Sequence, residues 1–296
     1  MRNLDQHTIT QEVIARLADT PDPRLKEVFG SLVRHLHDFA REVSLTEDEW
    51  AKGIAFLTAT GQKCDDKRQE FILLSDVLGL SMLTVAMNNA KPPQCTEATV
   101  FGPFFVDDAP HYDNGADVAN GAAGEPCEVS GAVLDPAGRP IAGAKIDVWQ
   151  ADAQGLYDVQ RDELDAAQGR GVLHADSEGR YHFHSVLAEA YPIPTDGPVG
   201  EFLAATARHP WRPAHLHFRI EATGYETLVT HVFREDDQWL DSDAVFGVRH
   251  SLIAPWVRRD DGSYSLHYDF VLNPATASKS APKTSSETAP ETTLRH

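Results

Sequence analysis

The spacing of the apolar residues changes once along this 296-residue chain, close to Pro92 and Pro93, and this change limits the folds open to it. Before the two prolines, apolar residues recur at i, i+3, i+4 and i+7, which is the spacing of amphipathic helices. After them, short runs alternate between apolar and polar residues and are separated by Gly and Pro, as in half-buried strands. We therefore expect an α+β fold, with a helical N-terminal region followed by a mostly antiparallel two-layer β-sandwich.

The helical region contains recognisable helix starts. Asp22 and Pro23 are a capping residue and a first-turn proline ahead of the first long apolar stripe. Thr46 and Glu49 form a capping box ahead of the next one. The segment 68–89 is apolar on more than one side, which predicts one helix buried between its own bundle and another domain or another chain.

The second region contains strand-like runs and then a polar end. A helical domain is expected over residues 1–95, a β-sandwich over 96–274 and a disordered tail over 275–296, where little is apolar. The expected strands are 127–134, 145–150, 181–187, 214–220, 227–233 and 264–272.

Charge and cysteine usage exclude several classes of protein. The formal net charge is -19 and no block of Lys or Arg occurs, so nucleic acids and anionic membranes are not expected partners. The three cysteines form no C-x-x-C pair, which argues against a disulfide framework and a thiolate zinc site. Residues 1–10 lack the apolar run of a signal peptide, and no run approaches the roughly 18 apolar residues of a spanning helix. A cytoplasmic protein is expected.

Three pairs among the fourteen histidines are candidate metal ligands because their members lie two residues apart. A pair on a helix diverges by about 200°, whereas a pair on a strand shares one face and can converge on one ion. The second pair alternates with Tyr181 and Phe183, so it can equally be the solvated face of its strand. The third follows a loop containing Pro210 and Pro213, which favours the rim of a site. The pairs are His35/His37, His182/His184 and His215/His217.

Two tyrosines lie in segments with a constrained backbone. Tyr157 follows a predicted strand and a glycine turn, and Tyr191 precedes the Pro-Ile-Pro run. Each is better explained, by itself, as an amphipathic ring with its hydroxyl at the surface. A carboxylate beside two histidines would instead make the facial triad of a ferrous extradiol or cupin oxygenase, and the composition leaves that alternative open.

Three strings together resemble the intradiol ring-cleavage dioxygenases: Gly-Leu-Tyr157-Asp, Tyr191-Pro-Ile-Pro and Arg212-Pro-Ala-His215-Leu-His217. The resemblance covers about residues 5–274. It implies one iron(III) ion per chain, held by those two tyrosines and two histidines, in an oxidoreductase of aromatic-compound catabolism. Two tyrosinates suit a trivalent cation, because the cation favours the phenolate.

The resemblance also implies roles and partners. Tyr191 is the ligand expected to leave when a catechol-type substrate binds, and Arg212 would stabilise negative charge on the substrate. The ring then opens with O2 between the two hydroxylated carbons. The family also implies a homodimer formed through the helices, and it allows for a bound phospholipid at that interface.

Within the family, residues 96–105 and 242–248 resemble the hydroxyquinol-cleaving branch, which acts on 1,2,4-trihydroxybenzene. His231 stands where catechol enzymes carry a glutamine, and Asp76 offers an acceptor for the third hydroxyl. The expected product is 3-hydroxy-cis,cis-muconate (maleylacetate), and the enzymatic alternative is a catechol 1,2-dioxygenase. The branch implies a substrate pocket formed by Leu73, Asp76, Val100, Phe101, Gly102, Pro103, Phe104, Ile193, Pro194, His231 and Val245.

A non-enzymatic alternative comes from residues 129–148, which resemble small transthyretin-like β-sandwich modules that bind partners. Such a module explains this stretch but neither the R-P-A-H-x-H string nor the two tyrosines. Colour separates the alternatives, because tyrosinate bound to iron(III) absorbs in the visible, whereas ferrous or metal-free protein is pale.

We predict opposite effects for substitutions in the two histidine pairs that lie on strands. His182→Ala and His184→Ala should leave iron content and the visible band intact, whereas His215→Ala with His217→Ala should abolish both. Metal analysis and absorption spectroscopy of the two double variants decide between the pairs. Loss of iron only from the His182/His184 variant would show that the ligand set is wrong.

Overall fold

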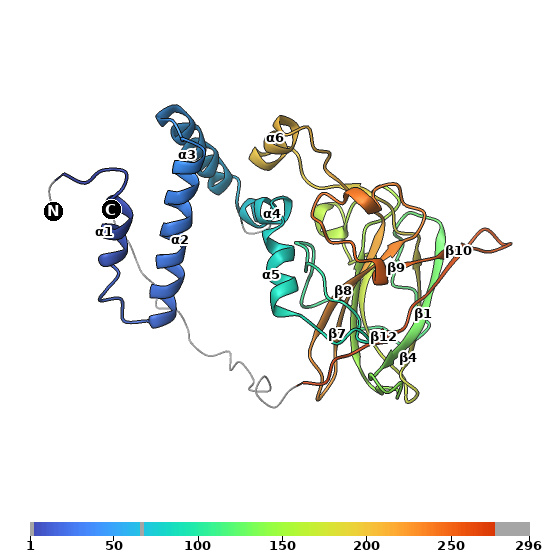
Figure 1. The fold of residues 1–296 in the computed structure, drawn as a ribbon. Helices are drawn as coiled ribbons and strands as arrows, with labels where there is room; N and C mark the ends of the chain where they lie inside the picture. The colour runs from blue at the N-terminus through green and yellow to red at the C-terminus, as the bar shows by residue number, and fades with distance from the viewer. Residues whose placement is uncertain (1–2, 66–67, 276–296) are drawn as a thin grey trace, which may run out of the picture. The chain divides into compact units, whose positions relative to one another are not determined.

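The computed structural model describes residues 3–65 and 68–275 (Figure 1). The chain divides into two compact units, residues 1–62 and residues 63–296. The helices of 63–89 thus group with the sheets, and the division between residues 95 and 96 drawn from the sequence stays a prediction. Nearly all of the predicted tail, from residue 276 onward, lies outside the described residues.

The first unit consists of three helices: α1 (Ile9–Ala15), α2 (Pro23–Glu42) and α3 (Glu47–Gln62). The Asp22 carboxylate caps α2 by accepting from the backbone N–H groups of the next turn. Thr46 and Glu49 form the expected capping box, with Glu49 N donating to Thr46 Oγ1 at 3.3 Å and Thr46 N donating to Glu49 Oε2 at 2.9 Å. The sequence therefore predicted both helix starts correctly.

The segment 68–89 is two helices rather than the single helix predicted from its apolar residues. These are α4 (Glu70–Val77) and α5 (Leu80–Asn88), and they are bent by 78°. Gly79 separates them with φ +74, a left-handed conformation that ends α4 and that glycine adopts at little cost. The apolar residues on several sides of the predicted helix thus belong to two shorter helices.

The length and apolar character of the helices also bear on whether any of them could cross a membrane. No single helix in the described ranges is long and apolar enough to cross a membrane. The α4 and α5 pair passes that test only when its two bent halves are counted together, by length and composition.

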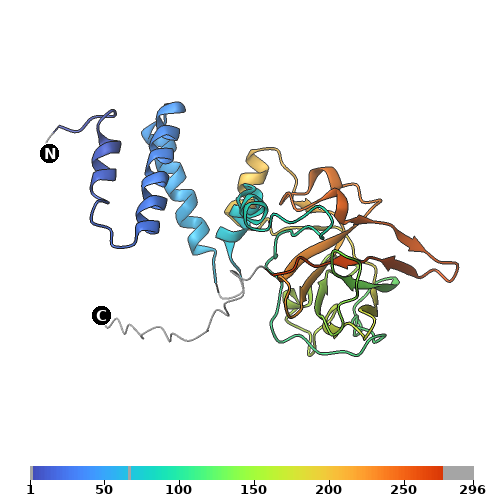
Figure 2. The same ribbon diagram turned by 60° about the horizontal axis from the view of Figure 1, so that its bottom comes forward.

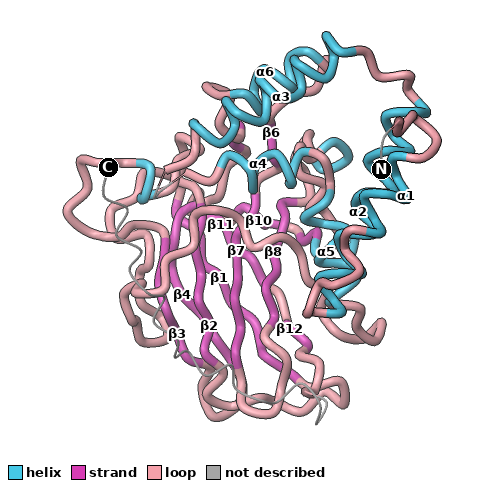
Figure 3. Tube along the Cα trace, turned by 90° about the vertical axis from the view of Figure 1, so that its left-hand side faces the viewer, coloured by secondary structure: helices cyan, strands magenta, loops and turns pink. Residues whose placement is uncertain are grey.

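The second unit contains two five-stranded sheets, whose strands are magenta in Figure 3. The first sheet has the order β10-β11-β1-β12, with β4 also paired to β1, and the second has the order β3-β2-β7-β8-β9. The strands of the first sheet are β1 (Pro126–Leu134), β4 (Arg180–Val186), β10 (Trp256–Arg258), β11 (Tyr264–His267) and β12 (Phe270–Val271). Those of the second are β2 (Lys145–Gln150), β3 (Arg170–His174), β7 (His215–Glu221), β8 (Leu228–Arg234) and β9 (Ile253–Ala254).

Most strand pairs are antiparallel, as expected, but the sheets are mixed. β1 pairs in parallel with β11 and β12, and β8 pairs in parallel with β9. The hairpin of β10 and β11, orange-red in Figure 2, extends from one edge. The run 264–272, predicted as one strand, is divided because the Asp269 carboxylate accepts from Ala132 N and interrupts the ladder.

The inner faces of the two sheets share one apolar core, which confirms the two-layer arrangement. Phe183 of β4 and Phe270 of β12 belong to the same buried cluster as Ile146 of β2 and Phe218 of β7. β1 alternates buried and partly exposed residues along its length, as a half-buried strand does. This core holds β7 at a fixed depth between β2 and β8.

Candidate active site

The four residues proposed as metal ligands come from three segments of the sheet unit. His215 and His217 are on β7, and His217 pairs with Trp149 of β2 on one side and His231 of β8 on the other. Tyr157 caps a short 3-10 turn (Asp158–Gln160) beyond the end of β2. Tyr191 lies in β5 (Tyr191–Pro192), which pairs with β6 (Trp211–Arg212). The ladder register therefore places Tyr191 opposite Arg212.

The side chains of these four residues converge, and all are buried. The hydroxyl of Tyr157 lies 2.8 Å from His217 Nε2, and that nitrogen lies 3.1 Å from His215 Nε2. Arg212 Nη1 donates to the Tyr191 hydroxyl at 3.3 Å and to His215 Nε2 at 3.2 Å. The structure thus gathers two phenol oxygens and two imidazole nitrogens around one point.

His215 presents a lone pair rather than a proton to this point. His215 Nδ1 lies 2.7 Å from the Pro213 carbonyl oxygen, and such a bond assigns the proton to Nδ1 and leaves Nε2 as the acceptor. Burial, with the nearby Arg212 charge, lowers the pKa of His215 to about 3. Burial also holds the pKa of His217 well below its usual value. Neutral imidazoles whose Nε2 atoms face each other are well suited to share a cation.

Tyr157, unlike a neutral imidazole, must lose a proton before it can bind a cation as a phenolate. Burial, reinforced by the neighbouring Tyr191, raises its pKa well above the ordinary value for a phenol. Without a cation the phenol keeps its proton, whereas a hard trivalent ion would favour the phenolate. The donor set therefore fits iron(III), provided that the ion displaces the phenol proton.

His231 is a third imidazole in the same cluster. The ligand atoms available from His215, His217 and His231 lie within 4.8 Å of one another, and no other such group of His, Cys, Asp and Glu occurs in the described residues. The Nε2 atom of His231 is buried and has no hydrogen-bond partner among the described residues. The sequence indicated His231 as a substrate contact, and the structure places it against His215 and His217.

Arg212 is itself held by a buried carboxylate that the sequence interpretation missed. Asp243 Oδ1 lies 3.1 Å from Arg212 Nε, and Asp243 Oδ2 accepts from Nη2 at 3.3 Å. Burial works to lower the pKa of Arg212, but Asp243, Tyr191 and Tyr157 together outweigh it and the pKa is raised. The signal that could have revealed Asp243 is general, because an arginine predicted to lie in a buried site needs a counter-charge.

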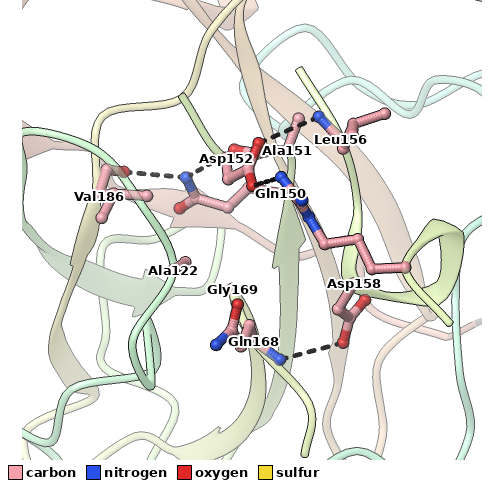
Figure 4. A pocket seen from close by; sticks show the side chains of 10 residues that line it. Ala122, Gln150, Ala151, Asp152, Leu156, Asp158, Gln168, Gly169 and Val186 are labelled. Carbon is pink, nitrogen blue, oxygen red and sulfur yellow. Dashed lines mark hydrogen bonds and ion pairs between the residues drawn. The ribbon is translucent and has the colours of Figure 1, made fainter. Parts of the chain in front are cut away.

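The turn that precedes Tyr157 is built on the Asp152 carboxylate (Figure 4). Asp152 Oδ1 accepts from the backbone N–H groups of Gln154 and Leu156, at 2.8 Å and 3.2 Å. On its outer side Asp152 is paired with Arg161. The chain therefore reverses after β2 and directs the Tyr157 ring inward.

A cavity of about 590 Å³ lies next to the site and is lined by five of the residues predicted to form the substrate pocket. Phe104 belongs to both regions, because its ring also stacks on Tyr157 with centroids 4.4 Å apart. The five predicted residues are Leu73, Asp76, Pro103, Phe104 and Pro194. Sequence reasoning missed its other lining residues, which are Asp65, Arg68, Gln69, Ile72, Phe105, Val159 and Gln160.

The remaining predicted pocket residues do not line this cavity. Val100, Ile193 and Val245 are buried. Gly102 lies so close to His217 that a Cβ there would be 3.1 Å from the imidazole Cε1. Phe101 is 41% exposed, and its ring packs on Phe105.

The competing histidine pair points away from the site. His182 and His184 occupy the exposed positions of β4, where they alternate with buried Tyr181 and Phe183. This is the solvated strand face that the sequence allowed. The geometry therefore favours His215 and His217 as the converging pair.

The chain is similar to known dioxygenases along most of its length. Residues 100–274 match the family model described as "Dioxygenase", and residues 22–96 match "Catechol dioxygenase N terminus". The chain is 70% identical to the 6-chlorohydroxyquinol 1,2-dioxygenase of Cupriavidus pinatubonensis, over 93% of this chain and 99% of the relative. It is 50% identical to the hydroxyquinol 1,2-dioxygenase of Nocardioides simplex, over 91% and 96% of the two chains. The crystal structure of hydroxyquinol 1,2-dioxygenase from Pseudomonas putida DLL-E4 superposes with a TM-score of 0.86 at 47% identity, over 91% and 99%.

Asp243→Asn should destabilise the fold in a pH-dependent way. Removing one partner of a buried ion pair costs about 3–5 kcal/mol, so the free energy of unfolding should fall by roughly that amount near pH 7. Burial works to raise the pKa of Asp243, but Arg212, His215 and the Gly247 backbone N–H together outweigh it and the net shift is downward. The stabilisation is therefore present above the ordinary value of 3.8 and lost as the pH falls through the lowered one. Urea unfolding from pH 7 to pH 3 should show the difference between variant and parent shrinking.

Asp236→Asn is the control, because the Asp236 carboxylate is exposed and Arg234 keeps a second partner in Glu189, so this pair should contribute less than about 1 kcal/mol. Equal stabilities of the Asp243 variant and the parent at pH 7, or a difference that grows on acidification, would contradict this account of Asp243.

Proposed function

Since this chain belongs to the intradiol ring-cleavage dioxygenase family, we propose that it binds one iron(III) ion and opens hydroxyquinol with O2. The observation that carries the proposal is the convergence of the Tyr157 hydroxyl with the Nε2 atoms of His217 and His215. The substrate follows from the relatives named for hydroxyquinol and 6-chlorohydroxyquinol. The product is 3-hydroxy-cis,cis-muconate, which tautomerises to maleylacetate. We also propose a cytoplasmic location, with which three cysteines that form no disulfide framework are in keeping.

We propose Tyr157, Tyr191, His215 and His217 as the four ligands. The three-histidine set that includes His231 is the alternative, but it omits both phenols, which converge on the same point. Bound iron(III) supplies the Lewis acidity that favours a deprotonated substrate and makes it reactive toward O2. The purified protein should accordingly contain iron and absorb in the visible, which tests the metal site directly.

The surrounding residues would handle protons and charge. The Tyr191 oxygen is the proposed acceptor for one substrate hydroxyl proton, since it faces the site and ends next to Arg212. Arg212 is the proposed electrostatic stabiliser of negative charge that develops on the substrate. Asp243 holds that guanidinium from the other side, so Arg212 needs little reorganisation when the substrate binds.

The 590 Å³ cavity is the proposed substrate pocket. Asp76 lines it and is buried, and burial raises the pKa of its carboxyl group above the ordinary value. A buried carboxyl group that can hydrogen-bond suits the third hydroxyl of hydroxyquinol. The basic residue of the lining, Arg68, is already paired with Glu70 and Asp196. A carboxylated ring such as protocatechuate would therefore meet no free cation at this position.

The apolar faces of the helices support a proposed homodimer. Helix α2 carries a stripe of large apolar side chains that are about half exposed, including Leu32 and Leu36. Continuous exposed apolar surface of this kind is typical of an interface. A phospholipid bound between the helices is a further expectation of the same proposal.

Hydroxyquinol should be cleaved with a much higher kcat/KM than catechol, and protocatechuate hardly at all. A site that satisfies the third hydroxyl discriminates against the analogue that lacks it. Asp76→Ala should lower kcat/KM for hydroxyquinol more than for catechol, while Asp76→Asn, which retains hydrogen-bonding groups, should lower it less. Steady-state oxygen uptake measures both. Equal or faster turnover of catechol by the unmodified enzyme would support the alternative function, a catechol 1,2-dioxygenase. It would not contradict the proposed iron site.

Light scattering at micromolar concentration should give the mass of a dimer. Leu32→Glu with Leu36→Glu should produce monomers, because two charges would have to be desolvated in an apolar interface. Arg34→Glu, on the same helix but turned away from that stripe, is the control and should remain dimeric. A monomer mass for the unmodified protein would refute the proposed assembly.

A further inference from the structure

We infer that Arg170 is a positioning residue that ties the ligand Tyr157 to the wall of the substrate pocket. This inference rests on the proposed function, since it takes Tyr157 as a ligand and the 590 Å³ cavity as the pocket. Arg170 is the first residue of β3 and is only 2% exposed. An arginine at this depth needs partners for its whole guanidinium group.

The guanidinium joins two segments that are far apart in the sequence. Arg170 Nε donates to Asp158 Oδ2 at 2.7 Å, and Nη2 pairs with Asp158 Oδ1. The remaining nitrogen, Nη1, donates to the carbonyl oxygen of Phe104 at 2.9 Å. A planar fork of donors can hold both acceptors in one fixed geometry.

Both segments bear on Tyr157. Asp158 is the next residue in the chain, and the Phe104 ring stacks on the Tyr157 ring at an interplanar angle of 26°. Gln160 in the same turn accepts from Tyr157 N through its side-chain oxygen at 2.9 Å. Arg170 therefore holds Tyr157 from two sides. Through Asp158 it holds the Tyr157 backbone, and through Phe104 it holds the face of the Tyr157 ring.

The same two segments form part of the pocket wall. Phe104 lines the cavity, and so do Val159 and Gln160, which follow Asp158. A shift of either segment would therefore change the orientation of the Tyr157 ring and the shape of the pocket together. Arg170 touches neither the proposed substrate space nor the ligand atoms, so its effect is exerted through its neighbours.

Lysine could not replace this arginine without loss. A single ammonium group can pair with Asp158, but it lacks the second parallel donor and the third nitrogen that reaches the Phe104 carbonyl. The Asp158 carboxylate would keep its backbone donors, Val159 N at 2.8 Å and Gln168 N at 3.1 Å. Arg170→Lys should therefore loosen the link between the two segments while the turn itself persists.

The test compares iron-loaded Arg170→Lys, Asp158→Asn, their double variant and Arg161→Lys. The last is a matched control, because Arg161 lies in the same loop but its guanidinium pairs with Asp152 and Gln154 rather than with Asp158 and Phe104. Iron content, the position of the visible band, and kcat and KM for hydroxyquinol are measured for each. The position of the band depends on the geometry of the tyrosinate. A residue that only stabilises the fold would leave the band unchanged.

We expect Arg170→Lys to retain iron, to shift the visible band and to raise KM for hydroxyquinol by roughly tenfold, below the 100-fold that misplacement by about 1 Å can cause. Asp158→Asn should shift the band in the same direction, and the double variant should show less than the sum of the two effects, as for residues in one network. Arg161→Lys should leave the band and KM close to those of the parent.

A parent-like band and KM in iron-loaded Arg170→Lys would overturn the inference, and so would an equal shift in Arg161→Lys. If Arg170→Lys does not fold, Asp158→Asn decides the question, and a parent-like band in that variant overturns it. An unmodified protein that lacks iron or the visible band would instead defeat the proposed function, so the two failures are distinguishable.

Discussion

The buried guanidinium of Arg212 is the group on which the arrangement of the site depends. It donates to the Tyr191 hydroxyl and to His215 Nε2, and Asp243 pairs with it from the other side. A full positive charge so deeply buried is tolerated only because Asp243 compensates it. The charge also opposes protonation of His215, so the same ion pair that stabilises this part of the fold keeps an imidazole lone pair available.

Strand register explains why the histidines could be predicted and the rest of the site could not. His215 and His217 are two residues apart on β7, so one face of a strand suffices to bring them together. The tyrosines were indicated by the resemblance rather than by their spacing. Asp243 lies 31 positions from Arg212, and Phe104 lies 66 positions from Arg170, so only tertiary structure unites these pairs.

The fold was predictable where a repeating pattern is long enough to see. The start of helix α2 and the bounds of strands such as β1 and β2 were expected at or near their observed positions. Strand β9 has two residues and β10 has three, which is too short for a period of two to show. The break at Gly79 was missed because one glycine within an apolar run reads as a tolerated residue rather than as a helix end.

Charge balance gives the two proposed tyrosine ligands different tasks. Burial opposes ionisation of Tyr157, so a buried cation and its phenolate would depend on one another. Tyr191 differs because Arg212 already donates to its oxygen. If Tyr191 takes a proton, the Tyr157 phenolate and a doubly deprotonated ring diol together carry three negative charges, which match the three positive charges of iron(III). Ionising both substrate hydroxyls, with one proton going to the Tyr191 oxygen beside Arg212 and the other to hydroxide from the solvent, would then leave no net charge in this buried site.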